Sequence, residues 1–453
     1  MASFLRKNRT PIAGVLQGET ISSFLFSLYV NDLPDMITAP DLINNELFIN
    51  LLMFADDMCC VSYTRDGLQK TLNKLSDYCL SWGLKVNTSK TKCTVFRKNG
   101  QIYKKDCWKF RGITLETTKE FKYLGFVFST SGTITAGLKA LKASARRALF
   151  DIKCISHNYP ELEVNNQLQL FNSLVKPILD YGCEVWGASD AVLLDRVHLS
   201  FLKNMLGVRK TTPNAFIYGE LGIFPLFIDP QVRMIKYWLK IINSPDTDLI
   251  NQAYKKLLND PTINSERKGI NWAADVRNIL ERNGFMFIWN QQQVLESDEL
   301  FISKLKQRLE DQYLQSWHEA VDETSNHRLY KSLKTSFEME KYLNCLEDNS
   351  LRIALSKIRL GSHNFMVERG KWGFPKLDFK DRICTTCKTI EDEYHCFIEC
   401  SRFKHLRKGL PKELLSKPSM FDFLNILKTS NTFHIKAIAL TSKCILSEYE
   451  KYK

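Results

Sequence analysis

The stretch that decides the fold is LFINLLMFADDMCCVSY, residues 47–63. Two apolar runs of strand length flank Asp56 and Asp57, which predicts a β-hairpin with the two aspartates at its turn. Aspartates are frequent in turns because their side chains bond nearby backbone groups, so an ordinary turn explains the pair. Carboxylates on a rigid hairpin also ligate Mg²⁺, and two such ions stabilise the attacking and leaving oxygens of phosphoryl transfer. The flanking sequence decides between these two interpretations.

A loop and an apolar run precede the hairpin. The loop is GVLQGETIS, residues 14–22, and the apolar run covers residues 24–30, followed by NDLP at 31–34. The two glycines permit backbone conformations and a close ligand approach that side chains would block. Ser22 is a candidate N-cap for a helix, and Pro34 would lie just past the helix end. By itself this pattern predicts a loop that leads into a buried helix.

The stretch after the hairpin changes from a helical to a strand pattern. WGLKVNTSKTKCTVF, residues 82–96, is predicted to end in a strand, and FKYLGFVF, residues 121–128, is predicted to be strand-type and broken by a glycine. An amphipathic helix is predicted before them, because apolar residues recur at helical spacing. These residues are Leu68, Leu72, Leu75, Cys79 and Leu80.

In this order and spacing, the four segments resemble motifs of the reverse transcriptases of non-LTR (LINE-type) retrotransposons. Residues 14–26 with 31–34 resemble motif B of the family, which implies that Gln17 and Gly18 lie against the template or the incoming nucleotide. Residues 54–57 resemble motif C, whose first aspartate ligates a catalytic metal ion. The resemblance therefore implies that Asp56 holds Mg²⁺ in the intact enzyme and that Asp57 supports it.

Two later segments extend the resemblance through the palm. Residues 84–92 resemble motif D, and Lys90 stands where the family has a lysine that assists at the phosphates. A lysine beside a strand is more often simply solvated, which is the alternative for Lys90. Residues 121–125 resemble motif E, which implies that Tyr123, Leu124 and Gly125 belong to a primer grip.

A helical region with cations on its surface follows the palm segments. Residues 171–182 and 184–187 resemble the thumb of the family, which tracks the minor groove of the primer–template, and residues 201–208 and 220–222 resemble its downstream pattern. An ordinary solvated basic helix explains the cations equally well. The apolar face is predicted to contain Leu138, Leu141, Ala145 and Leu149, and the cations are Lys139, Lys142, Arg146 and Arg147.

The C-terminal region contains the spacing C-x2-C-x7-H-x4-C, formed by Cys384, Cys387, His395 and Cys400. Two cysteines separated by two residues direct both thiolates at one ion, and a histidine and a third cysteine complete a tetrahedral Zn²⁺ site. Four protein ligands indicate a structural site with no open position. Cys396 is an alternative ligand, but it is the poorer one because it adjoins His395. Unligated cysteines in a reducing compartment are the other explanation.

The surroundings of these cysteines also resemble the family. The resemblance rests on residues 358–363 and on a set of charged and metal-ligating residues downstream of them, and it implies binding of template RNA. The set consists of Arg382, Cys384, Cys387, Glu391, Asp392, Glu393, His395 and Cys400.

The family has a further essential aspartate, in motif A, on a palm strand upstream of motif B. None of the 13 residues that precede Gly14 is acidic, and sequences resembling fingers or an N-terminal endonuclease are also missing. Acids from separate strands share the ions in the two-metal scheme. We therefore expect that this chain does not polymerise DNA by itself, and that the apolar strands beside the aspartates expose an uncovered sheet edge.

Composition agrees with a nucleic-acid partner without requiring one. Lys and Arg number 63 and Asp and Glu 50, a net charge of +13, and the excess is not concentrated in one run. The N-terminus has no apolar segment of the secretory type and no stretch is long enough to span a bilayer, which predicts a nuclear or cytoplasmic protein without membrane association. The 13 cysteines are then expected to be reduced thiols.

The expected fold is α+β: a partial right-hand polymerase palm, an antiparallel sheet with helices, followed by mainly helical regions and a small zinc-binding segment. The expected regions are a palm at 1–130, a thumb-like region at 131–225, a helical connector at 226–350 and a zinc-binding region at 351–453. The expected partners are an RNA template and a DNA primer. Two alternatives remain open: a non-catalytic nucleic-acid-binding remnant that uses thumb and zinc segment, and a decayed copy without function.

Overall fold

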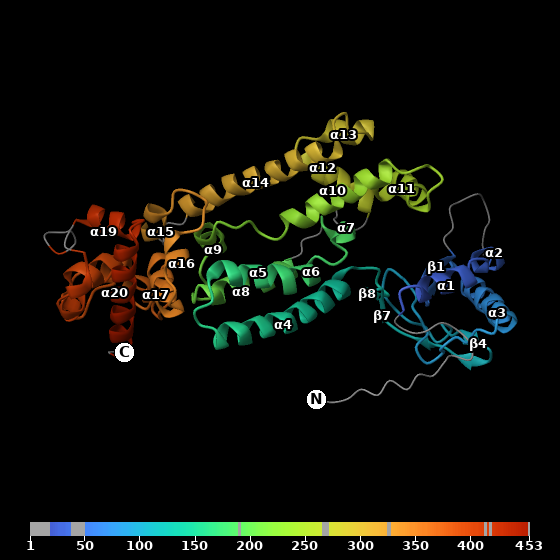
Figure 1. Ribbon diagram of the computed structural model, residues 1–453, viewed down its shortest axis with the longest axis horizontal. Helices are drawn as coiled ribbons and strands as arrows, with labels where there is room; N and C mark the ends of the chain where they lie inside the picture. Colours follow the sequence, from blue (N-terminus) through green and yellow to red (C-terminus); the bar gives the residue numbers. More distant parts are fainter. Residues whose placement is uncertain are drawn as a thin grey trace. The chain divides into compact units, whose positions relative to one another are not determined.

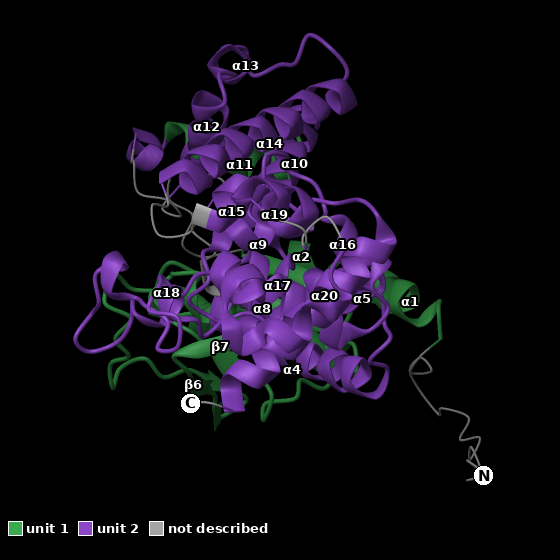
Figure 2. Ribbon diagram, turned by 90° about the vertical axis from the view of Figure 1, so that its left-hand side faces the viewer, with its two compact units in different colours: residues 1–137, 246–259 green, residues 138–245, 260–453 purple. Residues whose placement is uncertain are grey.

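The computed structural model describes residues 19–37, 50–188, 192–264, 271–323, 328–411, 415 and 419–451 (Figure 1). The chain forms two compact units, coloured separately in Figure 2. Unit 1 contains residues 1–137 and 246–259, and unit 2 contains 138–245 and 260–453, so the chain passes between the units three times. Within the described ranges, no helix is both long and apolar enough to cross a bilayer.

Unit 1 combines helices with two-stranded sheets, so the chain has the expected α+β class but is mostly helical. Three of the sheets are antiparallel hairpins, and the fourth pairs β3 with β6 in parallel. The elements are α1 (Ser22–Tyr29), α2 (Leu33–Met36), β1 (Leu51–Phe54), β2 (Asp57–Cys60), α3 (Arg65–Ser81), β3 (Lys92–Cys93), β4 (Lys109–Phe110), β5 (Ile113–Thr114), β6 (Glu116–Thr117), β7 (Glu120–Tyr123), β8 (Phe126–Ser129) and α11 (Leu249–Asn259).

Helix α3 supplies the apolar centre of unit 1. The Thr64 hydroxyl accepts a hydrogen bond from the backbone N–H of Gly67 and so caps the helix. The predicted apolar face is confirmed for Leu72, Leu75 and Cys79, which are buried. It is wrong for Leu80, which is 63% exposed, because a residue next to Cys79 is turned by about 100° around the helix.

Helix α1 differs from its prediction. It begins at Ser22 with Ile21 as the N-cap, so Ser22 does not cap it, and none of its residues is buried. Phe24 and Leu28 are 68% and 63% exposed, so the expected buried helix is wrong within the described residues. The buried apolar residues lie just beyond the helix, where Leu33 begins α2 and Pro34 occupies its first turn.

The end of α1 is tied to the end of α3. Tyr29 donates a hydrogen bond of 2.7 Å to the carbonyl of Trp82, and the two rings meet edge to face at 5.1 Å. Tyr78 on α3 donates to the carboxylate of Asp32. These contacts hold residues 29–32 against the C-terminal end of α3 and against Trp82, two residues before the segment that resembles motif D.

Residues 121–128 form a hairpin instead of one interrupted strand. Strands β7 and β8 pair antiparallel, with Tyr123 opposite Phe126. The two residues of the turn, Leu124 and Gly125, have φ of +45° and +88°. Positive φ at both positions is typical of the tight turns whose twist matches that of paired strands, and glycine adopts it without strain. The glycine therefore reverses the chain.

Unit 2 is helical in its described part. The predicted apolar face of α4 is confirmed, because Leu138, Leu141, Ala145 and Leu149 are all buried. The elements are α4 (Thr135–Asn158, whose first turn belongs to unit 1), α5 (Val164–Leu174), α6 (Lys176–Leu179), α7 (Cys183–Trp186), α8 (Val192–Met205), α9 (Asn214–Leu221), α10 (Ile228–Ile242), η1 (Pro261–Asn264), α12 (Trp272–Arg282), α13 (Met286–Gln291), α14 (Asp298–Glu323), α15 (Arg328–Leu333), α16 (Lys341–Cys345), α17 (Asn349–Arg359), α18 (Met366–Arg369), η2 (Phe379–Asp381), η3 (His395–Glu399), η4 (Ser401–Gly409), α19 (Met420–Leu427) and α20 (Thr432–Lys451).

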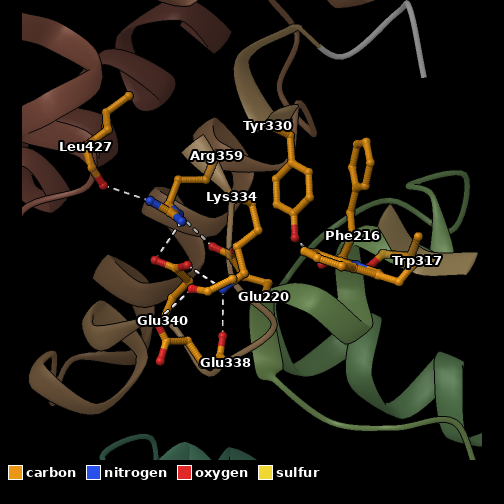
Figure 3. A network of polar contacts seen from close by, with 11 residues as sticks. Phe216, Glu220, Trp317, Tyr330, Lys334, Glu338, Glu340, Arg359 and Leu427 are labelled. Carbon is orange, nitrogen blue, oxygen red and sulfur yellow. Dashed lines mark hydrogen bonds and ion pairs between the residues drawn. The ribbon is translucent and has the colours of Figure 1, made fainter. Parts of the chain in front are cut away.

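A buried ionic network joins several helices of unit 2 (Figure 3). The guanidinium of Arg359, at the end of α17, lies 2.6 Å from the Glu220 carboxylate and 2.7 Å from that of Glu340. It also donates to the carbonyl of Leu427, the last residue of α19. The ammonium of Lys334 approaches the same Glu340 at 2.5 Å. Because Arg359 and Glu220 are both almost fully buried, removal of either partner would leave an uncompensated charge in the interior.

Candidate catalytic hairpin and metal centre

The first candidate site is the hairpin of β1 and β2. Its register pairs Leu51 with Cys60 and Phe54 with Asp57, which confirms the predicted hairpin. Ala55 and Asp56 form the turn, and Ala55 has a φ of +52°. Asp57 is the first residue of β2 and not a turn residue. A two-residue turn places the two neighbouring carboxylates at the tip of a short, rigid element.

Both aspartates are exposed at this tip. Tyr123, in β7, lies close by: its phenol has a raised pKa because of partial burial first and of the negative charge of Asp57 among the lesser causes. The structure thus brings the hairpin that resembles the primer grip next to the candidate catalytic hairpin. Among the described residues, no group of three metal-ligating side chains includes Asp56 or Asp57. Alone, the two carboxylates form an open and incomplete ligand set for a pair of metal ions.

The other predicted residues of the palm are placed as follows. Lys90 is exposed, in a turn where its backbone N–H donates to the carbonyl of Asn87 at 3.1 Å. Across the described ranges, Lys90 forms no ion pair, so it is available to a phosphate, although no contact links it to Asp56. Gln17 and Gly18 lie outside the described residues.

The strands beside the aspartates have apolar side chains in contact with water. Phe54 is 64% exposed, Val61 40% and Leu52 38%. Only β1 and β2 form this sheet within the described part of the chain. The hairpin therefore presents three partly solvent-exposed apolar side chains beside the aspartates.

The second candidate site is the cysteine–histidine cluster of unit 2. One ligand atom from each of Cys384, Cys387, His395 and Cys400 lies within 4.8 Å of the others. The sulfur of Cys400 is 3.9 Å from that of Cys384 and 3.8 Å from that of Cys387. Two sulfurs bound tetrahedrally at about 2.3 Å from a zinc ion would be separated by roughly 3.8 Å. The cluster could therefore hold a metal ion.

Local backbone geometry explains the approach of the first two cysteines. The N–H of Cys384 donates to the carbonyl of Thr389 at 2.7 Å, and the N–H of Lys388 donates to the carbonyl of Cys384 at 2.9 Å. Lys388 has a φ of +58°, in the left-handed region, and this reverses the chain after Cys387. The result is a tight turn that directs both thiols to the same side.

His395 is oriented as a metal ligand. Its Nδ1 lies 3.0 Å from the Thr389 hydroxyl and 3.3 Å from the Glu399 carboxylate. Its Nε2 is buried and has no hydrogen-bond partner among the described residues. A ligating histidine uses one nitrogen for the metal and donates from the other to a neighbouring acceptor, which fixes the ring. A buried nitrogen without a partner beside three thiols is explained if it binds an ion.

The thiols differ in their environments. Hydrogen bonds from the hydroxyl and backbone N–H of Ser401 lower the pKa of Cys387 to about 7, which favours the ligating thiolate. Burial raises the pKa of Cys400 to about 12, so that this thiol requires a cation to ionise. Cys396 is buried outside the cluster, and burial raises its pKa further. The geometry therefore excludes Cys396 from the ligand set.

The predicted residues around the cluster form hydrogen bonds with other residues of unit 2. The Nε2 of His363 lies 2.9 Å from Glu393, and Glu391 accepts hydrogen bonds from Tyr449 and from the N–H of Met366. Arg382 donates to the carbonyls of residues 367 and 377. Sequence reasoning missed Arg407, which donates to the carbonyls of residues 397 and 400 and so closes the segment that contains the last two ligands.

The comparison with known proteins matches one family to the N-terminal part of the chain, within unit 1. Residues 2–128 match the family described as reverse transcriptase (RNA-dependent DNA polymerase). The RNA-directed DNA polymerase from the mobile element jockey of Drosophila funebris is 25% identical over 195 residues, 41% of this chain and 21% of that protein. The retrovirus-related Pol polyprotein from a type-2 retrotransposable element of Drosophila melanogaster is 33% identical over 247 residues, 49% and 22% of the two chains. The match thus spans about a fifth of each relative's length.

Proposed function

We propose, from the premise that this chain belongs to the reverse transcriptases of non-LTR retrotransposons, that it serves RNA-directed DNA synthesis. The proposal is supported above all by the two exposed carboxylates at the tip of a rigid hairpin, beside the hairpin that contains Tyr123. An RNA template and a DNA primer are the proposed partners.

The proposed roles follow from chemistry and position. Asp56 would hold Mg²⁺ with support from Asp57, and the ion would supply charge stabilisation to the transferring phosphoryl group. Tyr123, whose phenol is protonated at neutral pH, would donate to the primer backbone beside the Leu124–Gly125 turn. Lys90 would approach the phosphates, and Gln17 and Gly18 would face the template or nucleotide.

We further propose that the chain by itself does not extend a primer. The support is the incomplete ligand set: within the described residues no third carboxylate joins Asp56 and Asp57. The purified chain, given an RNA template, an annealed DNA primer, nucleotides and Mg²⁺, is expected to extend no more primer than its Asp56→Ala variant. A parallel reaction of the same composition, with a retroviral reverse transcriptase in place of this chain, is the positive control. Extension that disappears in Asp56→Ala would contradict the proposal.

A second candidate function is nucleic-acid binding without catalysis, and a cluster of cations in unit 2 favours it. Lys142 and Arg146 on α4 lie near Arg196 on α8, and the pKa of Lys142 is lowered by partial burial and then by these two charges. None of the three forms an ion pair within the described ranges. Cations that gather without a carboxylate suit a phosphate backbone.

If the cation cluster contacts a phosphate backbone, the affinity of the chain for nucleic acid depends on salt concentration. Replacing Arg146 and Arg196 together with alanine is expected to weaken binding of an RNA–DNA duplex and to reduce the slope of log affinity against log salt by about 2. Lys306→Ala is the matched control, because Lys306 is exposed but already paired with Glu310. Fluorescence anisotropy at several salt concentrations measures both quantities. An unchanged slope in the double variant would remove α4 and α8 from the proposed interface.

A further inference from the structure

The segment between α18 and the first metal-ligating cysteine exposes two large aromatic side chains. Trp372 is 64% exposed, whereas no other tryptophan of the chain exceeds 39%. Phe374, two residues later, is 105% exposed, so its ring is in full contact with solvent. Phe379 is 37% exposed. Aromatic rings of this size are usually packed in a core or used at an interface.

The loop that contains them is closed at its base. The N–H of Leu377 donates to the carbonyl of Gly370 at 3.0 Å. The guanidinium of Arg382 donates from two nitrogens to the carbonyl of Leu377, at 3.1 and 2.9 Å, and from the third to that of Val367. The same side chain packs against Gly370, where a Cβ would meet the Arg382 Cγ at 2.8 Å. The two aromatic rings therefore project from a loop whose two ends are held together.

The loop is also basic. Residues 370–382 contain four cations and two aspartates. Lys371 is paired with the buried carboxylate of Glu368. Lys376 and Lys380 are exposed, and neither has a carboxylate partner in the described part of the chain. Two solvated cations beside two solvated rings match a ligand that has both negative charge and exposed aromatic faces.

A cavity of about 350 Å³ adjoins the loop. Lys371, Phe379 and Arg382 contribute to its wall from the loop side, and Tyr394 and Phe423 contribute aromatic rings from the side of the metal centre. The carboxylates of Glu368, Asp392 and Glu393 and the guanidinium of Arg359 also line it, so its wall mixes charged, apolar and aromatic groups. A cavity of this volume has room for one planar heterocycle.

We propose that the loop 370–380 is a stacking platform for unpaired nucleotides of single-stranded RNA, with one base on Trp372 and a neighbouring base at the mouth of this cavity. A duplex buries its base faces in its own stack, whereas a single strand presents them. The platform rests on the proposed nucleic-acid-binding function and names its substrate class. It also separates two surfaces: the cations of α4 and α8 contact the backbone of a duplex, and the loop holds an unpaired strand.

The test compares two probes with the full chain. Fluorescein-labelled oligoadenylate of about 12 nucleotides serves as the single strand, and an RNA duplex of the same length serves as the second probe. Trp372→Ala is expected to weaken single-strand binding by about tenfold and to leave duplex binding within about twofold. Trp372→Phe, which keeps a stacking face, is expected to restore most of the lost affinity. Phe433→Ala, at a ring 74% exposed on α20, is the control for loss of an exposed aromatic side chain.

Each outcome decides the proposal. Single-strand affinity that is unchanged in Trp372→Ala, while the wild-type chain binds both probes, overturns the platform and leaves the proposed function intact. An equal loss for both probes also overturns it, because stacking discriminates between them. If the wild-type chain binds neither probe, nucleic-acid binding itself is wrong. Phosphatidylserine vesicles serve as a third probe: if Trp372→Ala loses affinity for them while its RNA affinity is unchanged, the loop binds lipid and the platform is overturned.

Discussion

Replacing Cys384 with serine is expected to reduce the zinc content of the purified chain from about one equivalent to less than about a tenth. Cys384 is fully buried and its sulfur lies 3.9 Å from that of Cys400, so its replacement removes a ligand from the interior of the cluster. Structural zinc contributes roughly 10–16 kcal/mol to the folding of zinc-finger peptides. Loss of the ion should therefore unfold residues 383–401, measured as faster amide hydrogen exchange in this segment alone.

Two controls make the zinc result specific. Cys444→Ser removes an exposed thiol on α20 and should change neither zinc content nor exchange. Cys396→Ala removes a buried thiol next to a ligand and should reduce stability while the metal is retained. Full zinc occupancy in Cys384→Ser, or its loss in Cys396→Ala, would show that the ligand set is wrong. In the proposed RNA-binding role, Cys384→Ser should also weaken RNA binding.

The second large effect, a loss of folding stability, is expected when Arg359 is replaced. Its replacement by methionine leaves the carboxylate of Glu220, which is 0% exposed, without its cation. Breaking a buried pair by removal of one partner costs about 3–5 kcal/mol of unfolding free energy, because an uncompensated charge stays in the interior. The hydrogen bond to the carbonyl of Leu427 is lost as well. Urea denaturation, monitored by circular dichroism, measures the difference in unfolding free energy between the wild-type chain and Arg359→Met.

The matched double variant separates the charge from the packing. Arg359→Met combined with Glu220→Gln removes both charges and should recover at least about half of the loss, because the desolvated carboxylate is gone. Lys331→Met, at an exposed lysine paired with Asp322, should change stability by less than about 1 kcal/mol. If Arg359→Met is as mild as Lys331→Met, the network in Figure 3 does not hold the helices together.

Short-range signals in the sequence predicted the candidate sites well. The hairpin at Asp56 follows from two apolar runs around a turn, and the approach of the four metal ligands follows from their spacing. In both cases a few neighbouring residues determine the geometry. The structure supports the geometry of both sites, whereas their functions stay predictions. This applies to metal binding by Asp56, by Asp57 and by the four residues of the cysteine–histidine cluster, and to the roles of Gln17, Gly18, Lys90, Tyr123, Leu124 and Gly125.

Tertiary context accounts for what the sequence did not reveal. The apolar run of α1 has the composition of a buried helix, yet burial depends on what packs against it, and Phe24 is exposed in the described structure. Thr389 orients His395, and Arg407 closes the segment that contains the last two ligands. Neither residue belongs to a motif that the sequence analysis could have used. The aromatic loop at Trp372 was also missed, because exposure cannot be read from residue type.

The three passages of the chain between its units bear on the order in which it folds during synthesis. Helix α11 belongs to unit 1: Tyr254 is buried there, and the ammonium of Lys256 lies 6.0 Å from the centre of the Tyr63 ring. The N-terminal unit therefore cannot be completed when residue 137 leaves the ribosome. It waits until residue 259 emerges, which takes on the order of ten seconds at typical rates of translation. During that interval the exposed rings of Phe24 and Phe54 are in a nascent chain that lacks one of its helices, and chaperone capture is expected there.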